Sequence, residues 1–104
     1  MIERYVYVWE FRVRPGCEAE FEQHYGPSGT WAQLFALSTG YVETLLLKDN
    51  EHPGRYLTVD RWADEAAYQA FRSAHSRQYE QLDRQCAKLT THEALIGLFS
   101  ERRE

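Results

Sequence analysis

The stretch Tyr5-Val6-Tyr7-Val8-Trp9-Glu10-Phe11-Arg12-Val13 has the composition and the alternation of a β-strand. Side chains in a strand point alternately to the two sides of the sheet. One side of this strand would carry Tyr5, Tyr7, Trp9, Phe11 and Val13, and the other would carry Val6 and Val8 before it becomes polar at Glu10 and Arg12. Helices can cover the first side. The second side needs another cover, and a second copy of the same sheet is the simplest one.

Two later segments repeat this two-sided pattern. Alternation along residues 41–48 would place Tyr41, Leu45 and Leu47 opposite Val42 and Leu46. In a final strand over residues 92–100, Leu95 and Phe99 would lie opposite Ala94, Ile96 and Leu98. We therefore expect a homodimer that forms through the sheet faces.

Turn and capping residues divide the rest of the chain into elements. Pro15-Gly16 ends the first strand, and an acidic run that begins at Glu18 favours the first turns of a helix. The sequence Gly26-Pro27-Ser28-Gly29 interrupts that helix, and Thr30 can begin a short second segment. The turn-forming residues 49–54 predict a hairpin between strands 41–48 and 55–62.

The second half of the chain predicts further helix before the last strand. Asp64 is a good N-cap for a helix with Ala67, Tyr68, Phe71 and His75 on its inner face, and Ser76 can cap another helical segment. The order strand, helix, strand, strand, helix, strand is that of a ferredoxin-like βαββαβ fold of the α+β class. Right-handed crossovers place both helices on one side of a four-stranded antiparallel sheet. We expect a single domain over residues 1–104.

Composition limits the possible partners. The net charge is −4 and the basic residues are scattered, which argues against nucleic acid and against an anionic membrane. No apolar run approaches the roughly 18 residues needed to span a bilayer, so we expect a cytoplasmic protein. Cys17 and Cys86 form no CxxC pair, and two thiols are expected instead of a disulfide or a metal site.

Residues 55–62, with Asp64-Glu65-Ala66-Ala67 and then Phe71, His75 and Tyr79, resemble the antibiotic-biosynthesis monooxygenase family of dimeric α/β barrels. The resemblance spans nearly the whole chain. It implies oxidation of a small phenol or quinol by dioxygen, with no metal, flavin or nicotinamide cofactor. Such chemistry needs a base, hydrogen-bond donors for developing oxyanions, and walls that exclude water.

The same resemblance suggests which residues form the site. His75 falls where the family often has a helix histidine, and we expect its ring to face a cavity between sheet and helices as base or oxyanion donor. Other candidate catalytic residues are Tyr79, Tyr68 and His24. The expected walls of the cavity, which would bind a small aromatic or apolar metabolite, are Trp9, Phe21, Tyr25, Trp31, Trp62 and Phe71.

The chain also departs from the family. Phe71 stands where many members carry a second histidine, and Trp9, Phe71 and Gln81 stand where the haem-degrading branch has its Asn, Trp and His, which disfavours haem oxygenation. The four histidines lack any metal-ligand spacing. Two alternatives stay open: a non-catalytic binder of small apolar metabolites, and an isomerase or lyase that transfers protons on the same scaffold.

Overall fold

The computed structural model describes residues 3–102 and has the predicted ferredoxin-like βαββαβ architecture. The first half contains β1 (Arg4–Val13), α1 (Glu18–Tyr25), α2 (Thr30–Phe35) and β2 (Tyr41–Lys48). The second half contains β3 (Arg55–Trp62), α3 (Glu65–Ala74), α4 (Ser76–Cys86), a short 3-10 turn (Ala87–Leu89) and β4 (Thr90–Glu101). The expected break after the first helix and the expected hairpin are both confirmed.

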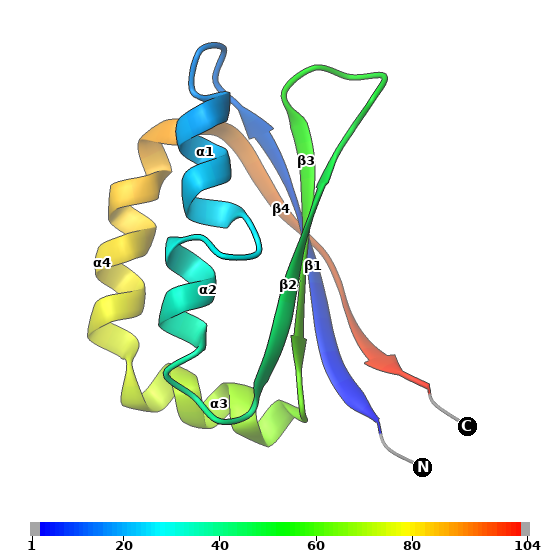
Figure 1. Cartoon of the computed structure of the whole chain (residues 1–104), viewed down its shortest axis with the longest axis vertical. Helices are drawn as coiled ribbons and strands as arrows, with labels where there is room; N and C mark the ends of the chain where they lie inside the picture. Colours follow the sequence, from blue (N-terminus) through cyan, green and yellow to red (C-terminus); the bar gives the residue numbers. More distant parts are fainter. Residues whose placement is uncertain (1–2, 103–104) are drawn as a thin grey trace.

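The four strands form one antiparallel sheet in the order β2-β3-β1-β4. All the helices lie on one side of this sheet, and the other side is left open (Figure 1). Asp64 caps α3 as predicted, because its carboxylate accepts a hydrogen bond of 2.8 Å from the backbone N–H of Ala67. The helices therefore form a single layer over the central strands β1 and β3.

The hydrophobic core lies between that layer and the sheet. Every second residue of β3 is buried on the helix side, namely Tyr56, Thr58, Asp60 and Trp62. Aromatic rings fill most of the remaining core, and Phe21 and Phe71 are almost completely buried. One of the four inward positions of β3 is thus occupied by a carboxyl group.

A β-bulge changes the predicted faces of β2. Tyr41 pairs with Trp62 and Thr44 pairs with Asp60, with a register shift between Tyr41 and Glu43. Directly paired residues share a side of the sheet, so Tyr41 and Thr44 both face the helices. The expectation that Tyr41 shares a face with Leu45 and Leu47 was wrong, because alternation restarts after the extra residue.

A second register shift, in the pairing of β1 with β4, changes the predicted faces of β4. Trp9 pairs with Leu95, whereas Val8 pairs with Gly97, so Ile96 is the extra residue. Leu95 therefore shares the helix side with Leu98, and Ala94 shares the open side with Phe99. The predicted grouping of Leu95 with Phe99 was wrong for this reason.

The open side of the sheet carries an apolar band across its centre. It consists of Val6, Val8, Leu45, Leu47, Leu57, Val59 and Phe99. Leu45, Leu47 and Phe99 are between 42% and 48% exposed, although they are large apolar side chains. The prediction of an uncovered apolar surface is thus confirmed for the centre of this face.

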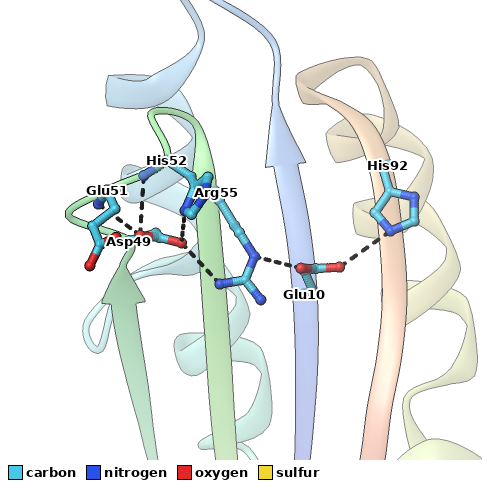
Figure 2. A network of polar contacts seen from close by, with 6 residues as sticks. All are labelled: Glu10, Asp49, Glu51, His52, Arg55 and His92. Carbon is cyan, nitrogen blue, oxygen red and sulfur yellow. Dashed lines mark hydrogen bonds and ion pairs between the residues drawn. The ribbon is translucent and has the colours of Figure 1, made fainter.

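Ion pairs lie at both ends of the apolar band. At one end Arg55 contacts Glu10 at 2.6 Å and Asp49 at 3.0 Å, and His92 lies 3.5 Å from Glu10 (Figure 2). The Arg55 guanidinium lowers the pKa of Glu10. At the other end Arg61 contacts Glu43 and Glu101.

The close approach of Gly40 to α3 makes a first test. A Cβ on Gly40 would lie 2.3 Å from the Cβ of Ala67, and the Gly40 carbonyl is already fixed by a 2.7 Å hydrogen bond from Ala63. We predict that Gly40→Ala lowers the free energy of unfolding by about 1–3 kcal/mol in urea titrations. In a double-mutant cycle, adding Ala67→Gly should recover part of this loss, and strictly additive effects would contradict the contact.

Candidate active site

A cavity of about 130 Å³ lies between the sheet and the helices. Its walls are mainly aromatic, and the rings come from three helices and from β1: Tyr7, Trp9, Phe11, Tyr25, Trp31, Phe35 and Tyr79. Five polar residues complete the lining: Thr44, Thr58, Asp60, Asp83 and Glu93. An apolar cavity with a few polar groups is the usual form of a small-molecule site.

Asp60 is the buried ionisable carboxyl group at the sheet side of the cavity. The alternation of β3 places the Asp60 side chain on the helix side of the sheet, and only 6% of the residue is exposed. The Thr44 hydroxyl donates a hydrogen bond of 2.5 Å to Oδ1 of Asp60. Burial raises the pKa of Asp60 to about 7, and the Thr44 hydrogen bond opposes this in part. Asp60 can therefore both accept and release a proton near neutral pH.

Tyr7 lies beside Asp60 on the neighbouring strand. The two residues are directly paired between β1 and β3, and the Tyr7 hydroxyl accepts a hydrogen bond of 3.3 Å from the indole N–H of Trp62. Burial, and then the nearby Asp60 carboxyl, raises the pKa of Tyr7 well above its ordinary value. The Tyr7 phenol consequently stays protonated and can act as a hydrogen-bond donor.

Exposed carboxyl groups mark the open end of the cavity. Asp83 on α4 and Glu93 on β4 line it and are both solvent-exposed. Partial desolvation, and then the Asp83 carboxylate, raises the pKa of Glu93. Among the described residues, no lysine, arginine or histidine lines the cavity. The site is therefore electrostatically unfavourable for an anionic ligand.

Trp31 and Tyr79 form the helix side of the cavity. Their ring centroids are 5.0 Å apart, and the guanidinium carbon of Arg72 lies 3.8 Å from the centre of the Tyr79 ring. Burial raises the pKa of Tyr79 to about 12. Within residues 3–102 the buried indole N–H of Trp31 has no hydrogen-bond partner.

The structure brings part of the predicted site together. Trp9, Tyr25, Trp31 and Tyr79 line the cavity, as expected from the sequence. The expected wall residues Phe21, Trp62 and Phe71 do not line it, because they are at most 1% exposed and fill the solid core beneath it.

His75, the first candidate for the base, lies outside the lining of the cavity. It sits at the junction of α3 and α4 with non-helical backbone angles, so it no longer follows the inner face of α3. Its ring packs 5.4 Å from that of Phe71, its buried Nδ1 has no partner in the described structure, and it does not line the cavity. The prediction that His75 faces this cavity was wrong.

His24 and Tyr68 also lie outside the cavity lining. His24 joins α1 to α2 through a contact of 2.9 Å between Nδ1 and the Thr30 hydroxyl. The Tyr68 hydroxyl accepts a hydrogen bond of 3.0 Å from Arg72, and its ring packs 5.1 Å from that of Tyr7. These contacts give both residues a structural role and no direct access to a ligand in the cavity.

Asp60 is the functional candidate that sequence reasoning missed. The signal was present, because Asp60 is the one residue with a carboxyl group among the inward-facing positions of a strand whose other inward residues are Tyr56, Thr58 and Trp62. A carboxyl group in such a position is rarely retained without a partner or a function.

The model of the antibiotic biosynthesis monooxygenase family matches residues 4–81. The chain belongs to this family. SnoaB from Streptomyces nogalater, a cofactor-independent oxygenase, is a similar solved structure with 24% identity, a TM-score of 0.76, and coverage of 98% of this chain and 96% of its own. Rv0793 from Mycobacterium tuberculosis has 16% identity and a TM-score of 0.73 over 97% of each chain.

A third similar structure is the NE2512 protein of unknown function from Nitrosomonas europaea, with 18% identity, a TM-score of 0.72, and coverage of 99% of this chain and 93% of its own. At these identities the likeness shows the fold. No curated protein sequence gives a significant match. Residues 3–102 contain no cluster of three or more potential metal ligands, and no helix among them has the length and hydropathy to cross a bilayer.

The buried carboxyl of Asp60 predicts a pH-dependent stability. Its pKa is 3.8 when unperturbed and about 7 in the folded protein, so stability falls progressively as the pH rises from about 4 to about 7, and the loss stays constant at higher pH. We predict that Asp60→Asn gains up to about 4 kcal/mol of unfolding free energy relative to the wild type as the pH rises from about 4 to 8. The control is Asp83→Asn at an exposed site, and a pH-independent difference for Asp60→Asn would contradict a buried, neutral Asp60.

Proposed function

We propose that this protein is a cofactor-independent monooxygenase that oxidises a small aromatic or quinol substrate with dioxygen in the cavity. The observation that carries the proposal is Asp60, a buried carboxyl whose pKa is raised to about 7 at the side of an aromatic cavity. Membership of the monooxygenase family and the fold shared with SnoaB, a cofactor-independent oxygenase, support it.

The size of the cavity favours a substrate with one aromatic ring. A dry protein cavity of about 150 Å³ accommodates benzene. The space of about 130 Å³ in this protein is comparable. Because carboxyl groups line the cavity and no cationic side chain does so among the described residues, a neutral phenol or hydroquinone suits it better than a carboxylated one.

In the proposed reaction Asp60 removes a phenolic proton, and Tyr7 donates a hydrogen bond to an oxygen of the substrate. The phenolate transfers one electron to dioxygen, and recombination of the two radicals forms a C–O bond to the ring. Cleavage of the O–O bond leaves one oxygen atom on the ring as a quinone or hydroxyquinone and releases the other as water. Hydroquinone and dioxygen thus give hydroxyquinone and water, with all four electrons supplied by the ring.

We also propose that two copies of the chain associate through the open sheet faces, as is general in the family. An apolar centre surrounded by ion pairs is the usual arrangement of a protein interface. The apolar band and the flanking clusters around Arg55 and Arg61 have this arrangement. Burial of the band would remove Leu45, Leu47 and Phe99 from water.

Oxygen uptake tests the activity. With unsubstituted hydroquinone, wild-type uptake should rise with pH through about 7 as Asp60 ionises, and Asp60→Asn should lower kcat by about 10²–10⁴-fold. Tyr56→Phe, which removes a buried hydroxyl outside the cavity, is the control and should retain the activity. A carboxylated hydroquinone should react more slowly than the neutral one.

Two outcomes would contradict the oxygenase, and a third would contradict the role of Asp60. Binding of hydroquinones without oxygen uptake would favour a non-catalytic binder. Exchange of substrate protons with deuterium from the solvent, without oxygen uptake, would favour an isomerase or lyase. Full activity in Asp60→Asn would remove Asp60 as the base.

Sedimentation analysis tests the dimer. We predict that the wild type sediments as a dimer and that Leu45→Asp shifts it toward the monomer, because a charge in the apolar centre of an interface loses its hydration. Leu37→Asp is the matched control, since Leu37 is 60% exposed in the turn after α2 and away from the sheet. A wild-type protein that remains monomeric at micromolar concentration would refute the proposed association.

A further inference from the structure

Two carboxylates from different layers lie at the open end of the cavity. Asp83 follows Tyr79 by four positions in α4, and residues at this spacing lie on the same side of a helix. Glu93 is paired with Phe11 between β4 and β1, so it shares the helix side of the sheet with that ring. Both carboxylates line the cavity, one from the helix layer and one from the sheet.

These two carboxylates lack a cationic partner. Within residues 3–102 neither Asp83 nor Glu93 forms an ion pair, whereas Glu10 on the other side of the sheet is paired with Arg55. Partial desolvation and then Asp83 raise the pKa of Glu93, and His92 opposes this only in part. Like charges held close to each other without a counter-ion repel. A cation between Asp83 and Glu93 would relieve this repulsion.

The aromatic rings next to these carboxylates suit an organic cation. The Trp31 ring packs against Tyr25 and Tyr79, with ring centroids 6.1 Å and 5.0 Å apart, and all three rings line the cavity. The faces of tryptophan and tyrosine rings attract ammonium and guanidinium groups. The Tyr79 ring already binds a cation in this way, because the guanidinium carbon of Arg72 lies 3.8 Å from its centre. Arg72 itself does not line the cavity.

The same groups do not suit a metal ion. Calcium and magnesium take six or more oxygen ligands. The open end offers two carboxylates, and residues 3–102 contain no group of three or more histidine, cysteine, aspartate or glutamate side chains that could hold a metal. An ammonium group on a carbon chain can use aromatic faces together with carboxylates. The arrangement therefore favours an organic cation.

An unpaired donor in the wall of the cavity independently indicates a ligand. Trp31 is only 8% exposed, and its buried indole N–H has no hydrogen-bond partner in the described structure. Buried donors in native proteins are nearly always hydrogen-bonded. A phenolic oxygen in the cavity would supply the missing acceptor. This observation does not depend on the two carboxylates at the open end.

We propose that the substrate is a phenol or hydroquinone that carries a protonated amine on a short side chain, an inference that rests on the proposed function. The ring occupies the cavity beside Asp60, and the ammonium group lies between Asp83 and Glu93. Because the cavity of about 130 Å³ is filled by a single ring, a side chain on that ring must extend to the open end. The cavity thus selects the ring, and the two carboxylates select the charge of the substituent.

Isothermal titration calorimetry with three para-substituted phenols tests the ammonium site. Dioxygen is excluded, so that only binding is measured. Tyramine carries an ethylammonium chain, 4-propylphenol is its uncharged analogue of the same size, and 3-(4-hydroxyphenyl)propionate carries a carboxylate. Tyramine should bind about 5–20-fold more tightly than 4-propylphenol, and the propionate should bind most weakly. Added salt should reduce the preference for tyramine, because it screens charges near the surface.

Neutralising the carboxylates tests their role directly. Asp83→Asn and Glu93→Gln should each lower the affinity for tyramine about threefold, and the double variant should bind tyramine and 4-propylphenol equally well. The matched control is Glu51→Gln, which removes one negative charge from the exposed turn between β2 and β3 and should keep the preference. Circular dichroism establishes that each variant is folded, and Asp83→Asn provides the test if Glu93→Gln is not.

The outcomes distinguish the ammonium site from the oxygenase. Equal affinity of the wild type for tyramine and 4-propylphenol, or a preference that survives in the double variant, refutes the ammonium site. If the wild type takes up oxygen with hydroquinone but has no higher kcat/KM with 2-(2-aminoethyl)hydroquinone, the inference is refuted and the oxygenase stands. If neither compound supports oxygen uptake but tyramine is preferred through both carboxylates, the oxygenase fails and the ammonium site stands as that of a binding protein.

Discussion

Burial of only one face of the sheet is the constraint on which the rest of the structure depends. The helices cover the side of β1 and β3 that carries the aromatic core, and they leave the opposite side to the apolar band and its ion pairs. A sheet covered on one side places the residues beneath its helices in a region of low polarity. The core, the cavity and the raised pKa of Asp60 all follow from this one-sided cover.

The aromatic composition of the core explains why a cavity can persist beside a carboxyl group. Rings such as Trp31, Tyr25 and Tyr79 are rigid, and the ring contacts among them support the walls. These walls keep water from Asp60, so its charged form is poorly solvated and its proton is held until near neutral pH. The same burial that costs stability when Asp60 ionises makes it a stronger base than an exposed carboxylate, which suits it to accept a proton from a phenol.

The β-bulge of β2 connects the sheet to the site. It aligns Tyr41 with Thr44, and Thr44 with Asp60, so that three polar side chains form one hydrogen-bonded row in an otherwise aromatic core. A buried polar row is stable only when its members satisfy one another. The bulge therefore helps to supply the partner that Asp60 needs.

The sequence by itself determined the order of elements and the one-sided helix layer, because alternation, turn residues and caps act over a few neighbouring positions. The resemblance carried by residues 55–79 indicated the family, which the family model confirms. It also suggested Trp9, Tyr25 and Trp31 as walls and Tyr79 as a catalytic candidate, and the structure places all four in the lining of the cavity. Only the tertiary structure decided that His75 leaves the inner face at a helix junction and that Asp60 lies at the cavity. It alone located the bulges that exchange the faces of β2 and β4. A single extra residue in a strand reverses the side of every residue beyond it, and burial of one carboxyl depends on rings from distant segments, so neither could be read from local pattern.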